Sequence, residues 1–218
     1  MTTATPPRPP RAIWVGFLLF FAVFALAFLL WLMQAVRLQP PPHVIGAVAD
    51  FTLTNQDDQI TTLTALTNHV WVADIIFTRC AGPCPRLTTQ MKSLQEKLPA
   101  ASHAKLVTLT TDPDFDTPVV LKKYGERAGA DFNRWTFLTG TKREIAQLAS
   151  GSLKLSAQPV KLQEQHDPAD LFIHATLFVV VDKHARLRAY FETGGDGVDW
   201  PSVQPKILET VRQLENEP

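Results

Sequence analysis

An uncharged apolar run near the N-terminus divides this chain into two parts that must fold in different surroundings. The run covers residues 12–36, which is 25 residues without a charged side chain. A helix of that length extends about 37 Å, enough to cross a hydrocarbon core of roughly 30 Å with some tilt. A cleaved signal peptide is the alternative, but its apolar region is normally shorter and ends at a small-residue cleavage site, which is missing here. The run therefore predicts an uncleaved, single-pass transmembrane anchor.

The charges beside the run predict its orientation. Arg8 and Arg11 precede it and only Arg37 follows it closely, and no acidic residue occurs before residue 50. Positive charge concentrates on the cytoplasmic side of membrane spans, so the N-terminus is expected in the cytoplasm. The rest of the chain is then expected on the periplasmic side of a bacterial inner membrane.

The composition around the anchor predicts four segments. Residues 1–11 contain four prolines and should be a disordered cytoplasmic tail, followed by the anchor at 12–36. Residues 37–47 include three consecutive prolines and should form a stiff spacer. Residues 48–218 are long enough for one domain with a full core. From residue 45 onward the chain carries 18 basic and 21 acidic residues, without a basic patch, so nucleic acid is not an expected partner.

Hydrophobic periodicity in the C-terminal part predicts an α/β domain with a central sheet. Apolar or alternating runs indicate strands, and stripes at helical spacing indicate helices between them. The expected strands lie within residues 51–54 and 60–63, which form a hairpin, and within 70–77, 104–110, 134–138, 176–181 and 187–191. Helices are expected to begin near Cys84 or Pro85, at Thr117 and Pro118, and at the capping box of Thr141 and Glu144, and to cover residues 203–214. Residues 151–172 show no clear period and are interpreted as a loop or insertion.

The two cysteines of the chain, Cys80 and Cys84, lie four residues apart directly after the apolar run 70–77. Such a pair on a turn that leaves a strand can bind a soft metal, cycle between dithiol and disulfide, or do both. Pro85 suits the first turn of a helix, whose N-terminal dipole favours a thiolate, so both sulfurs are expected to ionise more readily than a free thiol. Two small core residues, or a structural disulfide, are the alternatives.

Among the six histidines, His174 is the candidate nitrogen ligand. It stands at the start of the predicted strand 176–181, four residues after Asp170, where it could face the cysteine loop of a neighbouring strand. A satisfied core histidine is the alternative reading. His166 is a weaker candidate for a fourth ligand.

Three carboxylates in five residues, Asp112, Asp114 and Asp116, superficially suggest a site for a hard metal ion. Their place just before Thr117 and Pro118 favours another interpretation, in which they cap and turn the entry to a helix.

Four motifs, taken in order, resemble those of the SCO/SenC proteins. They are Phe77-Thr-Arg-Cys80-x-x-x-Cys84-Pro85, then Thr111-Asp-Pro-x-x-Asp116-Thr-Pro118, then Trp135-Thr-Phe-Leu-Thr-Gly140, and Asp170-x-x-x-His174 before an apolar strand that ends in Asp182. The resemblance spans about residues 45–215. It implies a thioredoxin-like domain on a membrane anchor that acts as a metallochaperone in the assembly of the binuclear copper site of cytochrome c oxidase.

The resemblance also implies the ligands and partners. Copper, as Cu(I) or Cu(II), would be held by Cys80, Cys84 and His174, with Asp170 orienting the histidine. The copper-bearing oxidase subunit and a copper donor protein would be its partners. The family's loop often has an acidic residue between the cysteines, whereas Ala81 and Gly82 stand here, which could shift redox potential and copper affinity. The alternatives are a thiol-disulfide oxidoreductase acting on an oxidase subunit or another extracytoplasmic client, and a redox or copper sensor.

Overall fold

The computed structural model describes residues 11–37, 41–155, 176–195 and 197–217. The chain divides into two compact units, Met1–Pro40 and Pro41–Pro218, which are described separately. His166, Asp170 and His174 lie outside the described residues.

The first unit contains one long helix, α1 (Arg11–Arg37). Its stretch Trp14–Leu32 has a mean hydropathy of 2.7, and none of that stretch is buried. A helix that is apolar on every side needs an apolar environment around it. This helix, which agrees with the predicted span, is therefore long and apolar enough to serve as a membrane anchor.

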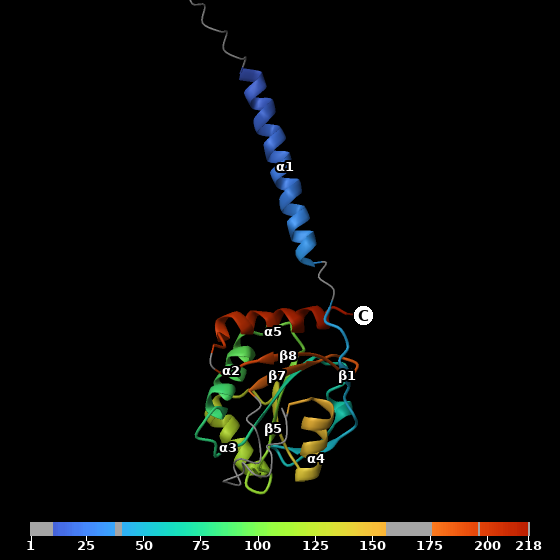
Figure 1. Ribbon diagram of the computed structural model, residues 1–218, viewed down its shortest axis with the longest axis vertical. Helices are drawn as coiled ribbons and strands as arrows, with labels where there is room; N and C mark the ends of the chain where they lie inside the picture. The colour runs from blue at the N-terminus through green and yellow to red at the C-terminus, as the bar shows by residue number, and fades with distance from the viewer. Residues whose placement is uncertain (1–10, 38–40, 156–175, 196, 218) are drawn as a thin grey trace, which may run out of the picture. The chain divides into compact units, whose positions relative to one another are not determined.

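An eight-stranded mixed sheet forms the centre of the second unit (Figure 1). The strands follow the order β1-β8-β7-β4-β5-β6-β2-β3 across the sheet. The neighbours β4, β5 and β6 are parallel, and every other pair is antiparallel. The strands are β1 (Gly46–Ala47), β2 (Thr52–Asn55), β3 (Ile60–Thr62), β4 (Trp71–Ile76), β5 (Lys105–Thr110), β6 (Trp135–Thr139), β7 (Leu177–Val181) and β8 (Arg186–Glu192).

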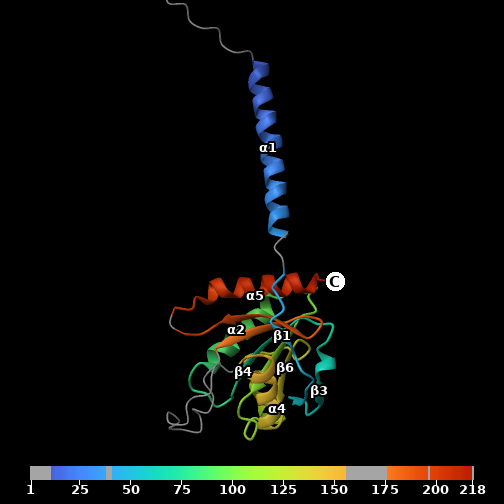
Figure 2. The same cartoon turned by 45° about the vertical axis from the view of Figure 1, so that its right-hand side comes forward.

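Helices cover both faces of this sheet (Figures 1 and 2). One face packs against α2 (Cys84–Lys97), α3 (Pro118–Ala128) and α5 (Trp200–Glu215), which contribute Leu87, Leu121 and Ile207 to the core. The other face packs against α4 (Lys142–Ala146) and the π-helical turn η2 (Gln147–Ser152), which contribute Ile145 and Leu148. A 3-10 turn, η1 (Leu63–Ala65), follows β3.

The central strand β4 shows why the sheet needs covering on both sides. All six of its residues are buried. Because side chains alternate along a strand, Trp71, Ala73 and Ile75 join the core under α4, while Val72 and Ile76 join the core under α2. Asp74 shares the face of Val72 and Ile76 and is completely buried.

Most of the predicted elements are confirmed, including the hairpin of β2 and β3 and the capping box, in which Thr141 Oγ accepts a hydrogen bond from the Glu144 amide at 3.2 Å. Strand β1 was not predicted, because two residues are too few to show a period. It pairs with β8 at residues expected to belong to the spacer. Gly151 and Ser152, expected to begin an irregular insertion, instead complete η2.

Candidate thiol and metal site

The parallel pairing of β4 with β5 brings two loops together at one edge of the sheet. Residues 77–83, here called the thiol loop, follow β4, and residues 111–117, here called the acidic loop, follow β5. The loops meet because parallel neighbours end at the same edge. The amide of Thr111 donates to the carbonyl of Ile76 at 2.8 Å, which fixes the starting point of both loops.

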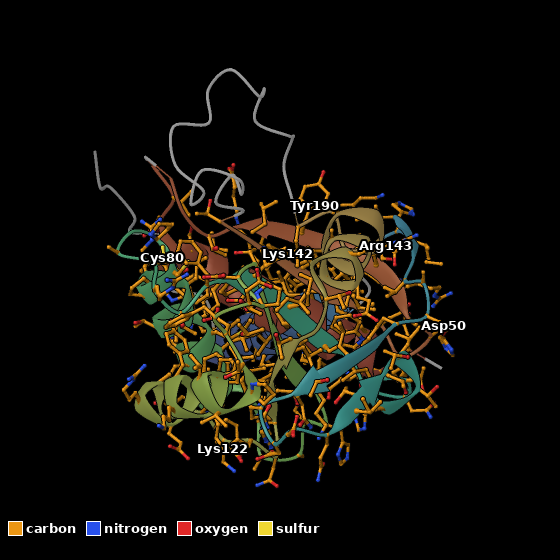
Figure 3. All side chains as sticks on the ribbon, turned by 90° about the horizontal axis from the view of Figure 1, so that it is seen from below. Asp50, Cys80, Lys122, Lys142, Arg143 and Tyr190 are labelled. Atoms are coloured by element: carbon orange, nitrogen blue, oxygen red, sulfur yellow. The ribbon has the colours of Figure 1, made fainter. Side chains whose placement is uncertain are left out.

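Both cysteines lie at this edge, in the thiol loop and at the start of α2. Cys80 and Cys84 are unbonded to each other and buried, with relative exposures of 8% and 4%. Both side chains belong to the same buried cluster, under α2. The amide of Gly82 donates to Cys80 Sγ at 3.3 Å, and Figure 3 labels Cys80 on the loop before α2. The structure therefore brings the two predicted sulfur ligands together.

The prediction that both sulfurs ionise readily is wrong for Cys84. Burial among apolar side chains raises the pKa of its thiol to about 12, although the backbone amide of Phe77 favours the thiolate. The neighbouring Cys80 thiol and the buried Asp74 carboxyl raise this pKa further. Cys84 is the first residue of α2, but the dipole of that helix does not overcome desolvation at this depth.

The acidic loop holds the residues that precede Cys80. Asp116 is fully buried, and its Oδ2 accepts hydrogen bonds from the Thr78 amide at 3.1 Å and from Thr110 Oγ at 2.5 Å. Its Oδ1 accepts a further bond from the hydroxyl of Thr78. The interpretation of Asp116 as a helix cap is therefore wrong: its carboxyl group binds the thiol loop.

The other two carboxylates of the acidic run have separate partners. Asp112 forms an ion pair with Arg79 at 2.5 Å, and the Arg79 guanidinium lies over the Phe115 ring at 4.0 Å from its centroid. Asp114 forms an ion pair with Lys142 at the start of α4. The three side chains thus bind different elements, and they do not converge on one point.

A second buried carboxyl group, which none of the sequence motifs includes, lies on β4 beneath the cysteines. Asp74 Oδ1 accepts a hydrogen bond from Thr108 Oγ at 2.6 Å, and Thr108 Oγ accepts one from Trp135 Nε1 at 2.8 Å. Oδ2 has no hydrogen-bond partner among the described residues. Burial raises the pKa of Asp74 to about 7, against the opposing effect of the Thr108 bond. A single acidic residue inside the apolar run 70–77 was the signal in the sequence.

The chain enters β7 at the same edge of the sheet, because β7 runs antiparallel to β4. Thr176, just before β7, accepts a hydrogen bond at its carbonyl from the Thr193 amide at 2.7 Å. A Cβ on the adjacent Gly194 would lie 2.7 Å from Thr176 Cβ and 2.3 Å from Nη2 of Arg86 in α2. The start of β7 and the first turn of α2 therefore crowd the same glycine.

No third Cys, His, Asp or Glu joins the two cysteines in a metal-binding group within the described ranges. The predicted ligand His174 and its predicted partner Asp170 are outside those ranges. His69 lies at the other end of β4, where its Nδ1 is 2.9 Å from the carbonyl oxygen of His103.

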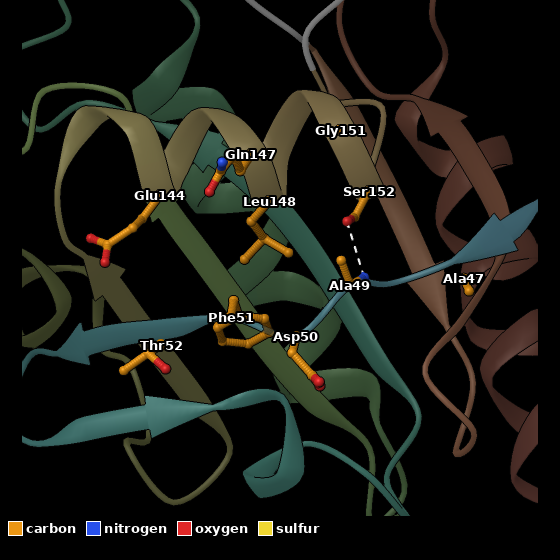
Figure 4. A pocket seen from close by; sticks show the side chains of 10 residues that line it. All are labelled: Ala47, Ala49, Asp50, Phe51, Thr52, Glu144, Gln147, Leu148, Gly151 and Ser152. Atoms are coloured by element: carbon orange, nitrogen blue, oxygen red, sulfur yellow. Dashed lines mark hydrogen bonds between the residues drawn. The ribbon is translucent and has the colours of Figure 1, made fainter.

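A separate pocket of about 740 Å³ lies between η2 and the segment that links β1 to β2. Asp50, Glu144 and Gln147 line it, and Ser152 Oγ accepts a hydrogen bond there from the Ala49 amide at 3.1 Å (Figure 4). In Figure 3, Asp50 and Cys80 lie on opposite sides of the view. The pocket is therefore distinct from the thiol site.

Comparison with known proteins gives a consistent result. The family model described as SCO1/SenC matches residues 42–200. The SCO1 protein homolog of Bacillus subtilis (strain 168) is 32% identical over 173 residues, which cover 78% of this chain and 76% of that protein.

Solved structures agree with this result. The structure of BsSco, described as a member of the Sco family of cytochrome c oxidase assembly proteins with a disulfide switch, is 30% identical. It has a TM-score of 0.67 and covers 83% of this chain and all of that one. ScoI of Bradyrhizobium japonicum with copper bound, at 21% identity and a TM-score of 0.57, covers 78% of this chain and 99% of that one, and shares the fold. The expected thioredoxin-like α/β fold is thereby confirmed.

Proposed function

Because the chain belongs to the SCO1/SenC family, we propose that it is a membrane-anchored copper-binding protein that assists assembly of the binuclear copper site of cytochrome c oxidase. One observation carries the proposal: the chain matches the family model over residues 42–200 and buries its two thiols in one cluster. Copper is the cargo in this proposal. Its ligands would be Cys80, Cys84 and His174.

The chemistry of the two sulfurs fits copper. Thiolates are soft ligands that favour Cu(I), and an imidazole is a suitable third donor. Cys80 is held by its loop and Cys84 by α2, so that both sulfurs belong to one buried cluster. Because the pKa of the Cys84 thiol is about 12, binding must displace its proton, and the metal supplies the energy for this step.

The position of Thr176 supports His174 as the third ligand. Thr176 is two residues beyond His174 in the chain, and Arg86 is two residues beyond Cys84. Both Thr176 and Arg86 lie beside Gly194. Two residues of chain span at most about 7 Å. So short a connection would allow the imidazole of His174 to reach the first turn of α2.

A copper competition measurement tests the proposal. The full-length, reduced protein is expected to retain one Cu(I) per chain against a chelator of moderate affinity. His174→Ala should lose most of this affinity because one of three ligands is removed, while His184→Ala, in the turn between β7 and β8, should retain it. Failure of the unmodified protein to retain Cu(I), or equal retention by both variants, would contradict the ligand assignment.

A second function, thiol-disulfide exchange, is favoured by one observation. The two cysteines are unbonded yet lie in one buried cluster, and the relative at 30% identity is described as containing a disulfide switch. Such exchange requires both sulfurs and no imidazole. If the principal role is reduction of a client such as an oxidase subunit, His174→Ala should lose copper and keep reductase activity on a model disulfide.

The anchor and the partners complete the proposal. Helix α1 would hold the second unit on the periplasmic side of a bacterial inner membrane, with Arg8 and Arg11 in the cytoplasm. The copper-bearing subunit of the oxidase would be the recipient, and a separate copper donor protein would load the site. A strain that lacks this chain should assemble oxidase with a deficient copper site, and added copper should restore it in part.

A further inference from the structure

We propose that Asp116 is a positioning residue for the thiol pair, because its buried carboxyl group holds the thiol loop in the arrangement that the reduced cysteines occupy. The inference rests on the proposed function of Cys80 and Cys84. It assigns to Asp116 a role that its place in a run of acidic residues does not reveal.

The contacts of Asp116 are concentrated on a single point of the thiol loop. Its side chain has a relative exposure of 0%, and Thr78 donates to it through both its amide and its hydroxyl. Thr110 Oγ is a third donor, at 2.5 Å, and belongs to the last residue of β5. The carboxyl group therefore ties a position two residues before Cys80 to the end of a strand in the sheet.

Asp116 is itself held in place from its own side. Its amide donates to the carbonyl of Asp112 at 2.8 Å, and the next residue but one, Pro118, begins α3. On the other side of the pair, Cys84 is fixed as the first residue of α2. The two cysteines are thus held by different elements: α2 holds Cys84, and Asp116 holds the loop that carries Cys80.

The arrangement favours the dithiol over the disulfide. Disulfide formation must bring the two sulfurs, which are unbonded here, to about 2.05 Å of each other. Because α2 holds Cys84, most of this movement falls on Cys80 and on the loop that Asp116 holds. Weakening the Asp116 contacts should therefore make the pair easier to oxidise.

The test is the equilibrium of the full-length protein with glutathione. Two protein S–H bonds break and one S–S bond forms, while glutathione disulfide accepts two electrons and two protons and becomes two molecules of glutathione. Asp116→Asn replaces one carboxyl oxygen by an amide nitrogen, which cannot accept from Thr78 or Thr110. The equilibrium constant should move toward the protein disulfide at least tenfold, or about 30 mV lower in reduction potential.

Asp182→Asn is the matched control. Asp182 is also a buried carboxyl group, with a relative exposure of 1%, but it binds Arg186 and Arg188 at the turn between β7 and β8. The variant should lower thermal stability and leave the glutathione equilibrium unchanged. Equal equilibria for Asp116→Asn, Asp182→Asn and the unmodified protein would overturn the proposal, as would failure of the unmodified protein to form the disulfide.

Two milder substitutions at Thr78 distinguish a role of Asp116 in positioning the thiol loop from a general effect on folding. Thr78→Val removes the hydroxyl donor but keeps the amide donor, and Thr78→Ser keeps both. The valine variant should shift the equilibrium in the same direction as Asp116→Asn, and the serine variant should restore it; identical equilibria for the two variants would overturn the proposal. Cu(I) competition on the same samples is independent of this outcome: absence of copper binding in all of them refutes the copper proposal and leaves the role of Asp116 standing.

Discussion

Asp74 places an acidic group where every neighbouring residue of its strand is apolar or small. Its carboxyl oxygen Oδ1 is satisfied by Thr108, while Oδ2 has no partner within the described part of the chain. An uncompensated oxygen of this kind costs free energy when the group is charged, which is why burial raises the pKa of Asp74 to about 7. The folded state therefore prefers the neutral acid.

This preference gives Asp74 a stability effect with a definite sign. Its pKa is 3.8 in the unfolded chain and about 7 in the folded one, so the folded state binds more protons between those values. The free energy of unfolding should fall as pH rises through that window, by on the order of 2–4 kcal/mol from this group alone. Asp74→Asn cannot lose a proton and should be free of this effect.

Urea unfolding of the full-length protein in mild detergent, from pH 4 to pH 8, checks this expectation. The stability of Asp74→Asn relative to the unmodified protein should increase with pH across the window. Taking the difference removes the contributions of the other carboxyl groups, including Asp182, whose effect has the opposite sign. A difference that stays constant with pH would refute the assignment.

At the level of elements, α3 and β6 approach closely where α3 has a glycine. A Cβ on Gly125 would lie 2.7 Å from a ring atom of Phe132 and 2.8 Å from a ring atom of Phe137. Gly125→Ala should therefore overpack this contact and destabilise the protein by about 1–3 kcal/mol. Gly151→Ala in η2 is the matched control, since a Cβ there meets nothing within 4 Å.

Thermal denaturation of both variants tests the contact. Gly151→Ala should be neutral or stabilising by up to about 1 kcal/mol, because it lowers the entropy of the unfolded chain. If Gly125→Ala matched it, the close packing of α3 on β6 would be incorrect.

Hydrophobic period was sufficient to predict the longer elements, because each buries one face or two and so leaves a repeat in the sequence. It could not predict β1, whose two residues pair with β8 through backbone groups alone. It also could not predict the roles of Asp74 and Asp116. Both depend on which strands are neighbours, since Asp74 on β4 is bound by Thr108 on β5, and Asp116 in the loop after β5 is bound by Thr78 in the loop after β4.

At the level of the whole second unit, Arg188 connects the N-terminal and C-terminal ends of that unit. Its guanidinium donates to the carbonyl of Pro42 through Nε at 2.8 Å and through Nη2 at 2.5 Å. It also forms ion pairs at 2.7 Å with Asp182 and at 2.6 Å with Glu217. The Arg188 side chain has a relative exposure of 5%, so little water reaches these contacts.

Arg188→Leu should therefore leave two carboxylates without their main partner. We expect a loss of about 3 kcal/mol, which lowers the melting temperature by roughly 6–12 °C. Burial acts to raise the pKa of Asp182, but hydrogen bonds from Arg188 and Arg186 lower it overall. Asp182 thus stabilises the fold above its unfolded pKa of 3.8, and this contribution disappears as pH falls further.

Differential scanning calorimetry at pH 7 and below pH 4 measures both effects. The stability difference between Arg188→Leu and the unmodified protein should be large at pH 7 and smaller in acid. A difference independent of pH would show that packing of the arginine side chain, rather than its charge, stabilises the ends of the unit.

Helix α1 is expected to hold the whole chain in the membrane. Cells that express the full chain should retain it in the membrane fraction after an alkaline carbonate wash, since α1 has 19 consecutive residues of mean hydropathy 2.7. A variant without residues 1–37 should be released. Protease added to spheroplasts should digest the second unit, and its survival there would contradict the periplasmic orientation.

Burial of both cysteine side chains restricts which molecules can react with them. The two residues have relative exposures of only 8% and 4%, so a bulky oxidant or an unrelated protein thiol would need the surrounding loop to move before it reached either sulfur. A cognate partner can supply binding energy for that opening, whereas a random encounter in solution cannot. Burial of the cysteines would therefore allow a reaction only with molecules that first bind the protein specifically.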